Sequence, residues 1–187
     1  MFLVEERLLN FQMNPQILHC MRQIQDLREV LAGKPLPGFD GHVAPEPVRP
    51  GGPPLVMGGM SDAAIRRTVE SCIGWTAGDA PPDAVLPFAQ RVREAWKEAR
   101  REGEPYIYAV AYFGLGEQHL EASKHSILSY YAYIGGGEVG FAESIPRTTD
   151  AIRSYQHAYE EAGVDEFIWD PTVPDVDQVD LLADAVL

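Results

Sequence analysis

A pair of glycines followed closely by a serine has the residue types of an anion-binding turn. Gly58 and Gly59 let the backbone turn tightly, and Ser61 stands where the N-cap of a following helix belongs. The first backbone N–H groups of a helix have no partner inside it, and the helix dipole favours negative charge at that end. The amides of Gly59, Met60 and Ser61, with the Ser61 hydroxyl, therefore suit a phosphate group. The alternative is that Ser61 only caps the helix and the glycines only turn the chain.

The residues on either side of this turn predict one parallel strand–helix–strand unit. Residues 55–58 are a short apolar run that follows two prolines, which is typical of a buried strand. Apolar residues recur at near-helical spacing through residues 63–72, and residues 73–77 form a second short strand. A second tight turn at Ala77 and Gly78 ends that strand. The unit thus places one glycine turn after each of two parallel strands.

Several stretches of the chain resemble the luciferase-like monooxygenases, which are flavin- or deazaflavin-dependent (β/α)8 barrel oxidoreductases. The stretches are LREVLAGKP from Leu27, PEPVRPGGPP from Pro45, PPLVMGGMSDAAIRRTVESCIGWTAG from Pro53 and EEAGVDEFIWDPTVPDVDQVDLLADAV from Glu160. They follow the family's order and spacing from about Leu27 to the C-terminus, and they resemble only the C-terminal half of the family barrel. One departure is Ile73, where the family often has an aspartate before the Gly-Trp pair.

The resemblance implies a flavin-dependent oxidoreductase or monooxygenase that acts on a small organic molecule. The implied cofactor is FMN, with the deazaflavin F420 as the alternative. The resemblance implies that the first turn holds the cofactor phosphate through Gly58, Gly59, Met60 and Ser61. It extends the cofactor site to Thr76, Ala77 and Gly78 after the next strand. The ring of such a cofactor carries the difficult chemistry, and we identify no residue of this chain as a general base.

Two other functions fit the same residues. A truncated half barrel could bind flavin or phosphate without turnover and act as an interaction module, because open strand edges favour association with another chain. An unrelated phosphate-binding barrel enzyme is the third hypothesis. Binding of flavin, and oxidation of a substrate that depends on it, distinguish the three.

Composition restricts the partners and the location of the protein. The 187 residues carry a net charge of −13, which repels nucleic acid and anionic membranes. A phosphate site must then rely on local backbone donors and on one or two basic residues. Arg66 and Arg67, one turn into the predicted helix, are either such residues or solvated surface charges. The two cysteines have no metal-ligand or disulfide spacing, so we expect thiols in a cytoplasmic protein with no metal site.

The order of the elements predicts an α/β fold, a parallel (β/α) partial TIM barrel of about four strands with helices outside. We expect a single domain over residues 1–187, in which 55–187 form a (β/α)4 half barrel. The expected strands are 55–58, 73–77, 106–113 and 166–170. Before them come an irregular segment at 1–15, a helix at 16–32 and a Pro/Gly-rich connection at 34–54.

The second half of the chain supplies the remaining expectations. Its helices are predicted at 83–101, 117–134, from Thr148 or Thr149 to about 162, and at 175–186, with a flexible loop from Gly135 to about Pro146. The strand YIYAVAYF is apolar throughout, which predicts burial on both faces. Tyr130, Tyr131 and Tyr133 line a substrate pocket or simply pack together. A half barrel leaves two open edges and a concave apolar face, so we expect a homo-oligomer.

Overall fold

The computed structural model describes residues 15–35, 38, 41, 44–135 and 137–187. These residues form two compact units. One comprises the described residues up to Leu55 together with Glu70–Cys72, and the other comprises Val56–Val69 and Ile73–Leu187. The expected irregular segment 1–15 lies outside the described residues except for Pro15, which begins the first described helix.

The N-terminal unit is built on one helix, α2 (Pro15–Leu31). Gly33 ends the helix, as the sequence predicts. It has φ +84° and donates its N–H to the Val30 carbonyl at 3.0 Å. The described part of the connection that follows contains turns but no helix or strand. A Cβ on Gly52 would lie 2.7 Å from the Cβ of Leu31, so the connection passes against the end of α2 where only glycine fits.

The larger unit contains a four-stranded parallel sheet with the strand order β1-β2-β3-β4. The strands are β1 (Val56–Gly58), β2 (Gly74–Thr76), β3 (Tyr106–Phe113) and β4 (Glu166–Pro171). All three neighbouring pairs are parallel, and Gly58 lies opposite Thr76. The sheet does not close on itself, so the predicted α/β partial barrel with four strands is confirmed.

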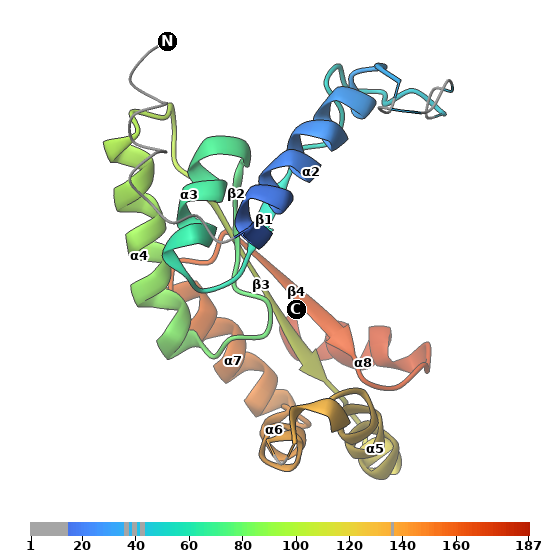
Figure 1. Cartoon of the computed structure of the whole chain (residues 1–187). Coiled ribbons are helices and arrows are strands. Elements are labelled where there is room, and N and C mark those ends of the chain that lie inside the picture. The colour runs from blue at the N-terminus through green and yellow to red at the C-terminus, as the bar shows by residue number, and fades with distance from the viewer. Residues whose placement is uncertain (1–14, 36–37, 39–40, 42–43, 136) are drawn as a thin grey trace. The chain divides into compact units, whose positions relative to one another are not determined.

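Helices connect the strands and follow the last one. They are α3 (Asp62–Ser71), α4 (Pro82–Glu98), the 3-10 turn η1 (Glu117–His119), α5 (Leu120–Tyr130), the 3-10 turn η2 (Ala132–Ile134), α6 (Glu138–Ser144), α7 (Thr149–Glu161) and α8 (Asp177–Val186). Figure 1 shows α4 and α7 on the same side of the sheet, with α5 and α6 beyond the carboxyl end of β3. None of the helices in the described ranges is long and apolar enough to cross a membrane.

Two expectations about the connection from β3 to β4 are wrong. Residues 117–134 form η1, α5 and η2 in place of one helix, and α6 lies within the predicted loop. The short α6 follows a run of glycines and shows only two turns of amphipathic pattern, too few for periodicity to detect. The predicted N-cap of α7 is confirmed at Thr148, whose hydroxyl accepts the Ala151 N–H at 3.2 Å.

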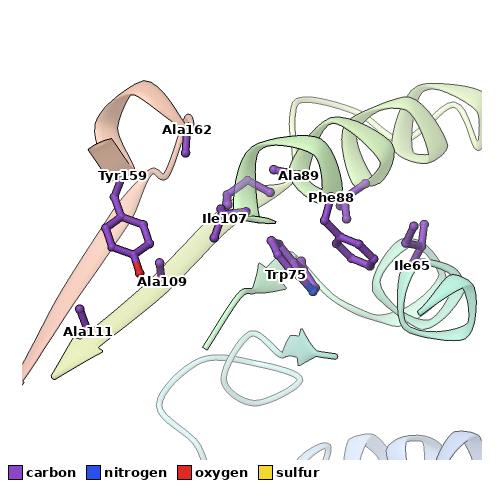
Figure 2. Packing of buried hydrophobic residues seen from close by; sticks show 11 residues of the cluster. Ile65, Trp75, Phe88, Ala89, Ile107, Ala109, Ala111, Tyr159 and Ala162 are labelled. Carbon is purple, nitrogen blue, oxygen red and sulfur yellow. The ribbon is translucent and has the colours of Figure 1, made fainter. Parts of the chain in front are cut away.

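The main core lies between the sheet and helices α3, α4 and α7. Trp75 of β2 and Ile107 of β3 are fully buried, and Phe88 of α4 packs on Trp75 with ring centroids 4.7 Å apart. Tyr159 of α7 covers the other end of this core and stacks on Phe167 of β4 at 4.4 Å. Figure 2 shows Trp75 and Ile107 on the strands with Phe88 and Tyr159 on the helices. Burial of this apolar layer is what holds the helices on one face of the sheet.

The opposite face of the sheet is only partly covered, which corrects the expectation that YIYAVAYF is buried on both faces. Along β3 the buried residues alternate with half-exposed or exposed ones. Tyr106 of β3 is 50% exposed, Ile168 of β4 is 45% exposed and Val56 of β1 is 37% exposed. These side chains are apolar like those that fill the inside of a closed barrel, but four strands leave them at the surface.

Strands β2 and β3 approach each other so closely at Gly74 that no side chain fits there. A Cβ at this position would lie 2.0 Å from the carbonyl oxygen of Tyr106. Gly58, on the neighbouring strand, is different, because a Cβ there would lie 3.6 Å from Cγ2 of Thr76, an ordinary contact.

We therefore predict that Gly74→Ala destabilises the protein by about 2 kcal/mol, because the strands must move apart to admit the methyl group. Gly58→Ala is the matched control and should change the free energy of unfolding by less than about 0.5 kcal/mol. Urea unfolding followed by circular dichroism measures both. Equal losses in the two variants would contradict the role given to Gly74.

The two unpaired edges and the exposed apolar face lead us to propose that the chain self-associates. In the described structure no strand pairs with the outer edge of β1 or of β4. Free edges and apolar faces of this kind favour association. Light scattering at micromolar concentration should give a dimer or larger species. The net charge of −13 does not prevent association, because physiological salt screens charge repulsion over about 8 Å. A cooperatively melting monomer would show that the face is stable in water.

Candidate functional site

The two turns predicted to hold the cofactor lie side by side at the carboxyl edge of the sheet. Gly58 ends β1 and Thr76 ends β2, and the two residues are directly opposite in the parallel register. The turn from Gly59 to Ser61 therefore begins next to the turn that contains Ala77 and Gly78. The carboxyl ends of the strands are where parallel α/β sheets bind ligands.

The first turn has the backbone geometry of a helix N-terminal anion site. Gly59 has φ +100°, a conformation that suits glycine and strains other residues. The Ser61 hydroxyl accepts the Ala64 N–H at 3.3 Å, so Ser61 does cap α3. The amides of Met60, Ser61 and Asp62 come before the first N–H that is bonded within the helix, and helix geometry provides no acceptor for them. Capping and anion binding are compatible here, because the cap uses a lone pair of the hydroxyl and leaves its proton.

Trp75 fixes the direction of the first turn, and sequence analysis did not identify it. The indole Nε1 of this buried side chain donates to the Gly59 carbonyl at 2.9 Å. In a trans peptide the carbonyl and the next N–H point in opposite directions, so the Met60 N–H is directed away from Trp75 and the core. The only sequence signal for this contact is a tryptophan directly after a glycine in a short strand.

The charges beside the turn are of both signs. Asp62, the first residue of α3, would repel an anion, but its carboxylate pairs with the guanidinium of Arg91 on α4. Arg66 lines a shallow groove between α3 and α4 together with Arg91, Glu94 and Glu98. The Nε atom of Arg67 is buried and has no hydrogen-bond partner among the described residues. A candidate anion site at the first turn would thus rest on backbone groups, and the carboxylate of Asp62 is paired with Arg91.

The second turn is held by the sheet through its backbone. Ala77 donates its N–H to the Tyr108 carbonyl at 2.9 Å, and the Gly78 carbonyl accepts the Val110 N–H at 2.8 Å. The Gly78 N–H is bonded to the Thr76 hydroxyl oxygen at 3.2 Å. The amides of Ala77 and Gly78 are therefore occupied inside the protein. What this turn offers a ligand is the hydroxyl proton of Thr76 and a flat glycine surface.

A buried polar cluster fixes the loop after β3 at the same edge. Gln178 of α8, fully buried, accepts the Leu115 N–H and donates to the Leu115 carbonyl, both at 2.8 Å. Thr172 donates to the Phe113 carbonyl at 2.8 Å and lies 2.8 Å from the Ser123 hydroxyl. All these groups are satisfied, which makes the loop rigid. Sequence analysis missed the cluster because its members are far apart in the chain.

Three tyrosines predicted to line a pocket or to pack together do both. Tyr131 packs on Phe141 of α6 with ring centroids 4.9 Å apart, and its hydroxyl donates to the Asp79 carboxylate at 3.1 Å. Tyr130 lines a cavity of about 230 Å³ beside Asp170 and Thr172. Tyr133 is exposed and lies 6.1 Å from Tyr131, ring to ring.

A parallel sheet with helices on one face and loops gathered at its carboxyl edge defines a partial (β/α) barrel. Residues 17–172 match the model of the luciferase-like monooxygenase family, and the chain belongs to this family.

Solved structures with the same fold include several oxidoreductases. An F420-dependent secondary alcohol dehydrogenase in complex with an F420–acetone adduct is 13% identical, with a TM-score of 0.61, and the match covers 88% of this chain and 59% of that one. The monooxygenase RslO1 from Streptomyces bottropensis is also 13% identical at a TM-score of 0.61, with 95% and 62% covered. A riboflavin lyase, RcaE, with modified FMN and its substrate riboflavin is 13% identical at a TM-score of 0.52, with 78% and 44% covered. The chain therefore spans about three fifths of the length of the first two.

The contact from Trp75 to the first turn can be tested with inorganic phosphate as the ligand. Trp75→Phe keeps a buried ring but removes the indole N–H, so the Gly59 peptide is no longer held. We predict a loss of about 1 kcal/mol in stability and a fall of about fivefold in phosphate affinity, measured by NMR titration.

Trp96→Phe is the control for this variant. Trp96 is also buried and donates its indole N–H to a backbone carbonyl, that of Glu102 at 3.4 Å, away from the turn. Its replacement should lower stability without changing phosphate affinity. Equal effects of the two variants on phosphate affinity would rule out a specific role for Trp75.

Proposed function

We propose that the protein is a flavin- or deazaflavin-dependent oxidoreductase whose first turn, Gly58–Ser61, holds the phosphate of the cofactor. The observation that carries the proposal is the turn itself. It combines a positive-φ glycine, a helix N-terminus and a peptide whose N–H is directed outward by Trp75. Family membership and the fold support it, since similar structures contain F420 or FMN.

The residues present fit such a cofactor. FMN and F420 both carry a phosphoryl group on the ribityl chain of a tricyclic ring, and the first turn provides the donors that a phosphoryl group needs. Thr76, opposite Gly58 on the next strand, presents a hydroxyl at the same edge. When bound, the cofactor supplies hydride transfer or activation of O2, and the protein contributes binding and orientation.

The substrate is proposed to be a small organic molecule, and the protein is proposed to work in the cytoplasm. Cys20 and Cys72 are not joined in a disulfide in the part of the chain that the structure describes, which is consistent with a reducing compartment. The net charge of −13 makes nucleic acid an unfavourable partner.

Variants of Ser61 separate helix capping from phosphate binding. Asparagine and aspartate cap a helix as well as serine, so Ser61→Asn and Ser61→Asp should leave the free energy of unfolding within about 0.5 kcal/mol of the parent. A carboxylate at this position repels phosphate. We predict that Ser61→Asp weakens FMN binding by at least about tenfold, or 1.4 kcal/mol, and that Ser61→Asn has a smaller effect.

Riboflavin, which lacks the phosphate, is the matched ligand for this experiment. Its affinity should be the same in the parent and in both variants. A loss of riboflavin affinity in Ser61→Asp would mean that the variant perturbs the ring site and not a phosphate contact. If the parent binds neither FMN nor F420, the proposal is wrong.

A second function has two observations in its favour. The sheet has two unpaired edges, and the chain covers 59% and 62% of two similar oxidoreductases. A half barrel that binds flavin or phosphate without turnover and serves as an interaction module is consistent with both facts. Substrate-dependent oxidation by the flavin-loaded chain favours the enzyme, and flavin binding without turnover favours the module.

A further inference from the structure

A separate cavity of about 310 Å³ opens at the carboxyl end of β3. It lies between the loop after β2, the end of β3, the segment from α6 to α7, and Tyr155 and Tyr159 of α7. Its lining residues are Asp79, Pro81, Ala111, Tyr112, Phe141, Ser144, Ile145, Pro146, Tyr155 and Tyr159. The volume is at the lower end of the range for small-molecule sites, and four of the lining residues are aromatic.

The hydroxyl groups of this cavity have their protons directed into the protein. Tyr155 donates to the Ser144 carbonyl at 3.0 Å, and Tyr159 donates to the Ala80 carbonyl at 2.9 Å. The Ser144 hydroxyl donates to the Phe141 carbonyl at 2.8 Å. Each of these oxygens retains lone pairs but has no proton left to give.

The hydroxyl proton of Tyr112 is also used inside the protein, in a hydrogen bond to a second tyrosine. The Tyr131 hydroxyl donates to Oδ2 of Asp79 at 3.1 Å, so its oxygen must be the acceptor in the 3.1 Å contact with the Tyr112 hydroxyl. The Tyr112 proton is therefore donated to the Tyr131 oxygen, and the Tyr131 proton to the Asp79 carboxylate. Asp79 itself is exposed, and Tyr131 donates to its Oδ2 atom.

The electrostatic character of the cavity follows from this arrangement. Burial raises the pKa of Tyr159 to about 12, and burial together with the bond to Tyr112 raises the pKa of Tyr131. These phenols stay neutral, so Asp79 carries the only formal charge on the lining. Arg147 holds the α6 end of the wall by donating to the Ala142 carbonyl at 2.5 Å and to the Ile145 carbonyl at 3.0 Å.

We propose that this cavity binds a small organic cation, a protonated amine on an aromatic or alicyclic body. Its wall offers hydrogen-bond acceptors and one carboxylate but no hydroxyl donors, so a bound molecule must supply the donors and gains from a positive charge. Aromatic faces attract such a cation, and the apolar ring of the ligand packs on Phe141 and Ile145. A neutral alcohol can donate only one hydrogen bond, and a carboxylate meets acceptors alone. The site differs from the proposed phosphate site, because none of Gly58–Ser61 and none of Thr76–Gly78 lines the cavity.

Three probes of the same shape and different charge test the proposal on the full chain without cofactor. They are 2-phenylethylamine, 2-phenylethanol and 3-phenylpropanoate, each titrated by calorimetry and by NMR of the backbone amides. The amine should bind about tenfold more tightly than the alcohol, and the carboxylate should not bind. The amide signals of Ala111 and Ile145 should shift with the amine, which places it in the cavity.

Asp79→Asn removes the charge, and Asp83→Asn is the matched control with the same change of net charge on an exposed residue just beyond the loop. The first variant should bind the amine no better than the alcohol, and the second should behave like the parent. Absence of amine binding to the parent, equal binding of amine and alcohol, or an equal loss in Asp83→Asn would overturn the proposal. None of these results bears on FMN binding at Ser61, so the two proposals fail separately.

Discussion

The hydrogen bond from the Trp75 indole to the Gly59 carbonyl connects the core of the larger unit to its candidate cofactor site. The same ring packs on Phe88, so a single buried side chain contributes to the helix–sheet interface and orients a loop at the surface. A loop that depends on a core residue is held as firmly as the core itself. This is a useful property where backbone amides must face a ligand in a fixed direction, because a flexible turn would lose binding energy in becoming ordered.

The two proposed sites prefer groups of opposite charge on a protein whose net charge is strongly negative. At the first turn an anion is disfavoured at long range, and the local backbone donors and the pairing of Asp62 with Arg91 must outweigh that effect. At the cavity beside Asp79 the negative net charge of the protein and the local hydrogen-bond acceptors both favour a cation. Two sites at one edge of a sheet can therefore differ in the sign of ligand they prefer, because nearby dipoles dominate over the net charge at short distance.

Much of the architecture was predictable from the sequence because its signals are local. Short apolar runs ended by glycine located β1 and β2 to within a residue or two, and helical spacing located α2, α4 and α7. Local signals failed at α6, which is short, and at β3, where an apolar strand does not reveal whether its second face is covered. For the site, the glycine turns were visible in the sequence, but the contact from Trp75 and the bonds of Gln178 join residues 16 and 63 positions apart. No periodicity or motif in the sequence indicates that such distant residues are in contact.

The two bonds between Gln178 and Leu115 also bear on how the protein unfolds. Gln178 stands at the start of α8, and Leu115 belongs to the loop that leaves β3, so the last helix is joined to the site edge by a buried amide and not only by apolar packing. If α8 opened locally, it would leave the Leu115 N–H and C=O without partners in an apolar environment. The opening of the last helix is therefore energetically tied to loosening of the site loop, and the two belong to one cooperative unit in the native-state dynamics.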